Sequence, residues 1–151
     1  MIEIRNERPF PAEIYEELIS MIPIGKSLIV FDGTCVLCNG LIKFLIRIDS
    51  NRNLLFTTFN SSLFELEENK PSIPQSLILI NHKGIFSGSE AVLETGISVQ
   101  RFIILFRIFS LVPGKIRDTL YRIVATHRYK VFGRTDQCFI PSIEDAVRFL
   151  K

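Results

Sequence analysis

Two cysteines separated by two residues are the part of this sequence best suited to chemistry. Cys35 and Cys38 follow the strand-like run at residues 28–31. At the start of a helix, such a pair lies nearly one turn apart, within reach of a disulfide bond. The first thiol then meets unpaired N–H groups and the helix dipole, which stabilise a thiolate. We therefore expect a redox dithiol in which Cys35 is the more exposed sulfur and attacks a substrate disulfide, and Cys38 resolves the mixed disulfide.

The residues before the pair supply a turn and a helix start. Asp32 and Gly33 are typical of a turn, and Thr34 is expected to be the N-cap of a helix that begins at Cys35. Asp32 is also a candidate catalytic residue, because a carboxylate at the strand end could accept a proton from Cys38 during resolution. The alternative is that Asp32 only accepts hydrogen bonds from the amides of the turn.

The motif around the dithiol resembles a known protein family. Asp32, Cys35 and Cys38 match the Asp-x-x-Cys-x-x-Cys signature of the DCC family of predicted thiol-disulfide oxidoreductases. The similarity spans about residues 28–138 and includes residues 88–93. It also includes a basic stretch with Pro113, Arg117, Tyr121, Arg128, Tyr129, Phe132, Gly133 and Arg134. The resemblance implies a thioredoxin-like fold and the exchange of a dithiol and a disulfide with a thiol-containing or disulfide-containing substrate.

Two other roles of the cysteines stay open. Buried cysteines are common as structural residues, which would make the chain a binding module that is not an enzyme. Two thiolates with this spacing also form half of a tetrahedral zinc site. The other half is not evident, since Cys138 stands alone, His82 falls in a predicted turn and His127 lies in a basic helix. We therefore expect neither a metal nor another cofactor.

The hydrophobic pattern predicts a single α/β domain over residues 1–151. The family resemblance implies that this domain has a three-layer, thioredoxin-like architecture with a mixed central sheet. An added N-terminal helix at 11–22 belongs to an extension over residues 1–26. The core is expected over 27–97, and basic helices over 98–151.

Within the core, a helix from Cys35 to about residue 48 separates strands at 28–32 and 54–59, which predicts a parallel β-α-β unit. A turn between runs ending at residue 80 and starting at 85 predicts a hairpin. Further helices are expected at 62–69, from Glu90 with Ser89 as its N-cap, at 98–111 and at 115–131.

A proline before the hairpin is the candidate for substrate binding. In thioredoxin-like folds a cis-proline at this place faces the dithiol and presents backbone groups to the substrate. Pro74 is the candidate here, together with Ser76 at the strand start. The alternative is that Pro74 is an ordinary loop proline, because most bonds before proline are trans.

Composition limits the other classes of function. The chain has 151 residues, 47% of them hydrophobic, which suits one domain with a sizeable core. Three cysteines and the lack of a secretory signal pattern lead us to expect a cytoplasmic protein.

Charge is distributed unevenly along the chain. Residues 100–134 carry eight Lys or Arg and one Asp, a net charge of +7, whereas the whole chain carries only +2. These helices could make a weak contact with an anionic membrane surface. Our expectation is that their apolar face packs over the sheet and their basic residues face solvent. We do not expect nucleic-acid binding, because no binding motif accompanies the charge.

Overall fold

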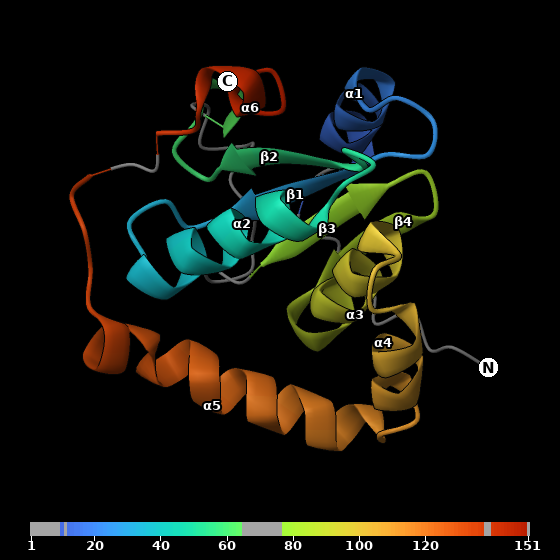
Figure 1. Cartoon of the computed structure of the whole chain (residues 1–151), viewed down its shortest axis with the longest axis vertical. Helices are drawn as coiled ribbons and strands as arrows, with labels where there is room; N and C mark the ends of the chain where they lie inside the picture. The colour runs from blue at the N-terminus through green and yellow to red at the C-terminus, as the bar shows by residue number, and fades with distance from the viewer. Residues whose placement is uncertain (1–9, 11, 65–76, 138–139, 151) are drawn as a thin grey trace.

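In the residues that the structure describes, a four-stranded mixed sheet forms the centre of the molecule (Figure 1). A computed structural model describes residues 10, 12–64, 77–137 and 140–150. Strand order is β2-β1-β3-β4, with β1 parallel to β2 and antiparallel to β3, and β3 antiparallel to β4. The strands are β1 (Ser27–Phe31), β2 (Leu54–Thr58), β3 (Ile78–Asn81) and β4 (Gly84–Ser87). The predicted β-α-β unit and hairpin are therefore confirmed.

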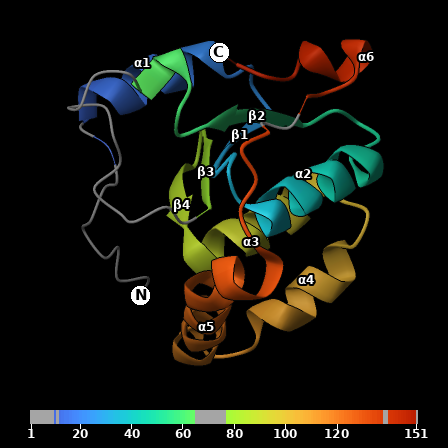
Figure 2. The same cartoon turned by 90° about the vertical axis from the view of Figure 1, so that its left-hand side faces the viewer.

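Helices cover both faces of this sheet (Figures 1 and 2). The helices α2 (Val36–Ile48) and α3 (Gly88–Val99) pack on one face, and α1 (Ala12–Met21) packs on the other. Alternate residues of β1 divide between the layers, because successive strand side chains point to opposite faces. Ile29 contributes to the cluster on the α2 and α3 side, whereas Leu28 packs with Leu18 of α1. This arrangement confirms the three-layer, thioredoxin-like α/β fold with an added N-terminal helix.

The helical boundaries after the core differ from the expected ones. Helix α3 begins at Gly88 with Ser87 as its N-cap, so Ser89 lies inside the helix. The helix expected over 98–111 is divided, because Gln100 adopts a left-handed φ of 62° and ends α3. The remaining elements are η1 (Ser62–Phe64), α4 (Ile103–Ser110), α5 (Gly114–Phe132) and α6 (Ile143–Ala146).

Helices α4 and α5 lie beside the core, not over the sheet (Figure 1). No side chain of α4 is buried, and α5 buries only Arg128. The expectation that their apolar face covers the sheet is wrong, since Ile104 is 72% exposed and Leu111 is 81% exposed. Contact of α4 with α3 depends on Gly96, where an added Cβ would overlap the ring of Phe106. None of the helices in the described parts of the chain has the length and apolar character needed to cross a membrane.

The C-terminal segment is fixed to the edge strand β2. The backbone N–H of Phe56 donates to the carbonyl of Arg148 at 2.8 Å, and that of Leu150 donates to the carbonyl of Phe56 at 2.9 Å. The buried guanidinium of Arg148 forms an ion pair with Asp49 and donates to the carbonyl of Leu54 at 3.1 Å. Residues after α6 are thereby held against the end of α2 and the start of β2.

Candidate active site around the dithiol

Both motif cysteines lie at the start of α2. Cys35 is the N-cap, with extended φ and ψ of −89° and 119°, and its Sγ accepts the backbone N–H of Cys38 at 3.3 Å. Thr34, expected as the N-cap, instead donates its N–H and its hydroxyl to Asp32 Oδ1, at 2.9 and 2.8 Å. The sulfur of Cys35 therefore occupies the place of a capping oxygen, where the end of the helix stabilises negative charge.

The two thiols differ in exposure, in the order opposite to the one expected. Cys35 is 0% exposed, whereas Cys38 is only partly buried. The chain after α5 returns across the start of α2 and covers Cys35. Arg134 forms an antiparallel β-bridge with Cys35, and the N–H of Thr135 donates to the carbonyl of Thr34 at 2.9 Å. The prediction that Cys35 is the more exposed thiol is therefore wrong.

The surroundings of Cys38 favour its protonated form. Burial raises the pKa of the Cys38 thiol to about 12, and the hydrogen bond and negative charge of Cys35 act in the same direction. The positive charge of Arg128 opposes this rise only in part. At neutral pH Cys38 therefore keeps its proton.

Asp32 is held by four donors from the described part of the chain. Besides the two bonds from Thr34, its Oδ2 accepts the hydroxyl of Tyr129 and lies 3.5 Å from Nη2 of Arg128. Burial would raise the pKa of Asp32, but the hydrogen bonds from Tyr129 and Thr34 and the charge of Arg128 lower it below its ordinary value. These contacts fit the turn-holding role of Asp32. A proton-accepting role toward Cys38 stays a prediction, and the lowered pKa makes Asp32 a weak base.

Arg128 and Tyr129 near the end of α5 complete the site, although neither was a candidate site residue in the sequence analysis. Arg128 is 7% exposed, and its Nη2 donates to the hydroxyl of Tyr129 at 3.1 Å. The Tyr129 ring lies below two guanidinium groups, 4.7 Å from that of Arg128 and 4.1 Å from that of Arg134. Both residues belong to the basic stretch of the family resemblance, which was the available signal for this contact with Asp32.

The ionisation states of Arg128, Tyr129 and Asp32 depend on one another. Burial lowers the pKa of Arg128, but its hydrogen bond to Tyr129 and, at the high pH where an arginine titrates, the ionised thiols raise this pKa above its ordinary value. Burial and the hydrogen bond to Asp32 raise the pKa of Tyr129. Arg128 therefore stays a cation and Tyr129 a neutral donor, next to the carboxylate of Asp32 and the dithiol.

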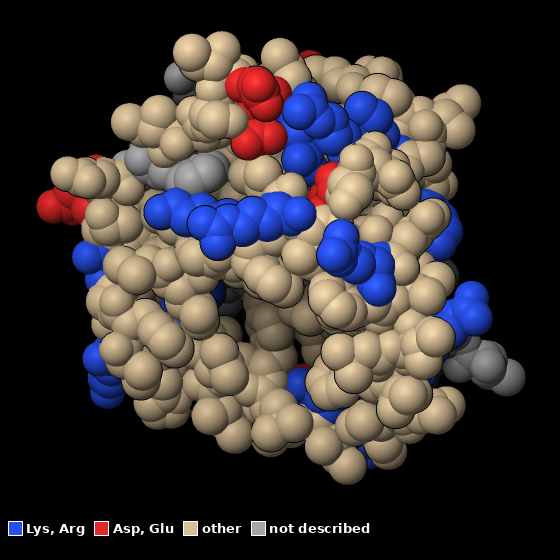
Figure 3. All heavy atoms as spheres, in the orientation of Figure 1, with Lys and Arg blue, Asp and Glu red and all other residues tan. Residues whose placement is uncertain are grey.

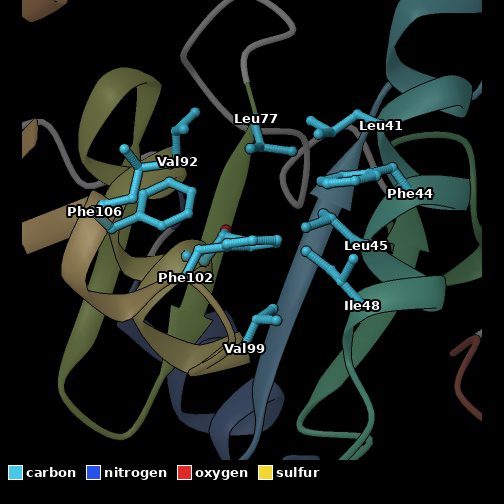
Figure 4. A pocket seen from close by; sticks show the side chains of 12 residues that line it. Leu41, Phe44, Leu45, Ile48, Leu77, Val92, Val99, Phe102 and Phe106 are labelled. Atoms are coloured by element: carbon cyan, nitrogen blue, oxygen red, sulfur yellow. The ribbon is translucent and has the colours of Figure 1, made fainter.

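A groove opens beside Cys38. It has a volume of about 320 Å³, and its walls include Leu37 of α2 and Arg128 of α5. A second cavity of about 250 Å³ shares Leu41, Leu77 and Val92 with it and continues between α2 and α4. Figure 4 shows the apolar side chains of α2 facing those of α3 and α4 across this second cavity. In the space-filling view the surface is hollowed between α2 and α5 (Figure 3).

Three residues named from the sequence cannot be placed. Pro74, Ser76 and Cys138 lie outside the described residues, so their roles stay predictions. Within the described ranges no three His, Cys, Asp or Glu side chains gather into a group that could hold a metal ion. His82 Nε2 lies 2.9 Å from the carbonyl of Ile22, and His127 Nδ1 lies 2.8 Å from that of Ile123.

The chain is similar to known proteins over the part that contains this site. The profile of the DCC1-like thiol-disulfide oxidoreductases matches residues 29–134, which contain the dithiol, Asp32, Arg128 and Tyr129. The chain is 31% identical over 131 residues to the uncharacterized protein YuxK of Bacillus subtilis, covering 84% of this chain and 96% of that protein. It is 34% identical over 118 residues to the chloroplastic DCC family protein At1g52590 of Arabidopsis thaliana, covering 75% of this chain and 69% of that protein. No solved structure matches it. On the match over these residues, the chain belongs to the DCC1-like thiol-disulfide oxidoreductase family.

Proposed function

We propose that this protein exchanges thiols and disulfides through a reversible bond between Cys35 and Cys38. The observation that carries the proposal is the hydrogen bond from the Cys38 N–H to Cys35 Sγ at the start of α2. It stabilises a thiolate on Cys35 next to a protonated thiol that lines an open groove. Membership of the family supports the same reaction class.

Accessibility suggests which sulfur meets the substrate. In the oxidised protein a substrate thiolate attacks Cys38 Sγ, because Cys35 is enclosed. A bond forms between the substrate and Cys38, and Cys35 leaves as a thiolate held by the N–H of Cys38. A second substrate thiolate then attacks the substrate sulfur of this mixed disulfide. Cys38 leaves as a thiolate and takes up a proton. Two substrate thiols become one disulfide, and the protein disulfide becomes a dithiol.

The same features suggest the direction of electron flow. A disulfide is a stronger oxidant when its reduced form is stabilised. Here the helix start stabilises charge on Cys35, and the cation of Arg128 interacts with both sulfurs. Attack by Cys38 on a substrate disulfide is slow at neutral pH, since burial raises the pKa of Cys38 to about 12. We therefore propose that the protein oxidises thiols, in a cytoplasmic setting as expected from its few cysteines.

Single-turnover kinetics tests this proposal. The oxidised protein is mixed with 2-mercaptoethanol, and a linear peptide of residues 32–41 that carries the same disulfide is the control. We expect the protein to react at least about tenfold faster than the peptide, because a stabilised leaving thiolate accelerates exchange. Equal rates would mean that the fold adds nothing to the chemistry.

The alternative of a binding module with structural cysteines is favoured by one observation, the complete burial of Cys35. In that case mild oxidation leaves both thiols free, and the oxidised protein cannot be prepared. Thiol titration before and after treatment with diamide separates the two functions. Loss of two titratable thiols per chain supports exchange, and loss of none supports the module.

A further inference from the structure

We propose that the groove beside Cys38 binds a small amphipathic thiol or disulfide, with an aliphatic chain between its sulfur and a terminal carboxylate. The inference rests on the proposed function and names the substrate class of the same site. Its evidence is the placement of two arginines at the ends of an apolar wall.

One face of α5 forms this wall. Side chains three and four positions apart lie on the same face of a helix. The groove is lined from α5 by Arg117, Leu120, Tyr121, Val124, Ala125 and Arg128. Its opposite walls come from α2, α3 and α4, with Leu41, Val92 and Phe109. A ligand in the groove therefore meets apolar side chains along its length and a guanidinium at each end.

The two arginines face different surroundings. Arg128 lies next to the dithiol and is paired with Asp32. Arg117 lies 11 positions earlier, which corresponds to about 16 Å along the helix axis. Its Nε and Nη1 are buried without a hydrogen-bond partner, and it forms no ion pair with any carboxylate in the described part of the chain. The neighbouring Asp118 accepts the hydroxyl of Ser89 at 2.5 Å.

Arg117 is half-buried, and its two enclosed guanidinium nitrogens lack a hydrogen-bond partner, which is unfavourable. A carboxylate is the group that fits them best. Since the sulfur of the substrate must reach Cys38, near Arg128, the carboxylate belongs at the other end of the groove, at Arg117. An extended chain advances about 1.2 Å per bond. Eight carbons therefore span about 10 Å, and the side chain of Arg117 covers the remaining distance.

The size of the groove favours a small molecule. Its volume of about 320 Å³ falls at the lower end of the range of small-molecule sites, roughly 300 to 1,000 Å³. The second cavity, of about 250 Å³, gives room for a longer or branched chain beyond Leu41 and Leu77. In the reaction, two molecules of the thiol are oxidised to their disulfide while the bond between Cys35 and Cys38 is reduced.

The first experiment compares thiols that differ in one property. Oxidised protein is mixed with 8-mercaptooctanoate, with 8-aminooctane-1-thiol of equal length and opposite charge, and with 3-mercaptopropionate of equal charge and shorter chain. Each rate constant is divided by the fraction of that thiol which is ionised at the pH of the assay. We expect 8-mercaptooctanoate to react about tenfold faster than either, since it alone fills the apolar wall and meets Arg117. Equal rate constants for all three overturn the inference.

Variants on α5 identify the groups responsible. Arg117→Gln should remove the preference for the carboxylate over the amine, and Leu120→Asp should remove it by repelling the anion. The matched controls are Arg122→Gln and Ile123→Asp, whose side chains are exposed on α5 and do not line the groove. An equal loss of preference in the control variants would overturn the assignment to the groove.

A binding measurement separates this inference from the proposed function. Octanoate has no sulfur, so its binding to the reduced protein, followed by calorimetry, does not depend on exchange. We expect octanoate to bind, octylamine to bind at least tenfold more weakly, and Arg117→Gln to abolish the difference. Absence of octanoate binding overturns the inference even if 2-mercaptoethanol reduces the protein. Failure of every thiol to reduce the oxidised protein overturns the proposed function. The binding of octanoate still tests whether the groove binds an aliphatic carboxylate.

Discussion

Cys38 faces the groove, whereas Cys35 is enclosed by the bridge to Arg134, and this difference sets their roles. We predict that Cys35→Ser accumulates a mixed disulfide on Cys38 when the reduced variant is treated with hydroxyethyl disulfide at pH 9. The resolving thiolate is then missing. Cys38→Ser should accumulate at least about tenfold less mixed disulfide on Cys35, because the sulfur of Cys35 is not exposed.

Peptide mass mapping measures both adducts and counts any adduct on Cys138 separately. Preferential trapping on Cys35 in Cys38→Ser would reverse the roles and restore the order first expected from the sequence. Both variants carry one serine in place of one cysteine, so each serves as the control for the other.

The carboxylate of Asp32 makes a pH-dependent contribution to stability. The folded-state pKa of Asp32 is lowered, so this contribution is complete above its unfolded pKa of about 3.9 and is lost as the pH falls through the folded value. We predict that Asp32→Asn lowers the free energy of unfolding by about 1–3 kcal/mol at pH 7, since Arg128 loses its buried counter-charge.

Denaturant unfolding at pH 7 and at pH 3 tests this prediction. The difference between wild type and Asp32→Asn should be smaller at pH 3 than at pH 7, because pH 3 lies below the unfolded pKa of about 3.9 and the unfolded chain then binds the proton. Asp136→Asn, at an exposed position, is the control and should change little at either pH. Equal stability of Asp32→Asn and wild type at pH 7 would mean that the pair with Arg128 contributes nothing.

The sequence predicted the residues of this site only in part. The spacing of Cys35 and Cys38 was sufficient to place both at a helix start, because the turn and the strand before them are local. The enclosure of Cys35 and the partners of Asp32 were not predictable from spacing. They depend on Arg134 and Tyr129, which lie about a hundred residues further along the chain and reach the dithiol only through tertiary packing.

At the scale of elements, the contact between α3 and α4 depends on a missing side chain. We predict that Gly96→Ala lowers the free energy of unfolding by about 1–3 kcal/mol, because its Cβ would overlap the Phe106 ring and move α4. The control is Gly40→Ala in α2, where a Cβ has no atom within 4 Å. That variant should instead gain up to about 1 kcal/mol from its better helix propensity.

Urea unfolding of both variants measures these changes. If Gly96→Ala is as stable as Gly40→Ala, then α4 adapts freely and does not form a fixed wall of the second cavity. The two substitutions are chemically identical, so their difference reports the packing of α4 alone.

Element type was more predictable than element ends. The apolar runs of β1 and β2 and the turn between β3 and β4 indicated the sheet, because strand patterning and turn residues are local signals. The break at Gln100 was missed, since glutamine carries no signal for a left-handed backbone. Thr34 was chosen as the N-cap because a hydroxyl is the usual capping group, whereas the structure uses the sulfur of Cys35.

In the whole molecule, a buried ion pair connects the C-terminal segment to the core. Asp49 accepts the backbone N–H groups of Asn53 and Leu54 and pairs with Arg148. We predict that Arg148→Met lowers the free energy of unfolding by about 3–5 kcal/mol, because it leaves the charge of Asp49 buried without its partner. Arg47→Met on the exposed side of α2 is the control, and it should change stability by less than about 0.5 kcal/mol.

Thermal and denaturant unfolding measure this effect. A change in Arg148→Met no larger than in Arg47→Met would show that the segment after α6 docks without the pair. The sequence placed a helical region at 98–151 but did not indicate this return to β2, since the bridge between Phe56 and Phe149 joins segments distant in the chain.

The central claim is a reversible bond between Cys35 and Cys38, and an equilibrium redox titration with mass mapping tests it most directly. The purified protein is equilibrated in buffers of graded ratio of reduced to oxidised glutathione, and its peptides are mapped at each ratio. The account predicts a single two-electron transition, with the loss of two hydrogens confined to the peptide that contains Cys35 and Cys38. Free thiols at both positions across the whole range, or a dominant bridge that includes Cys138, would contradict it.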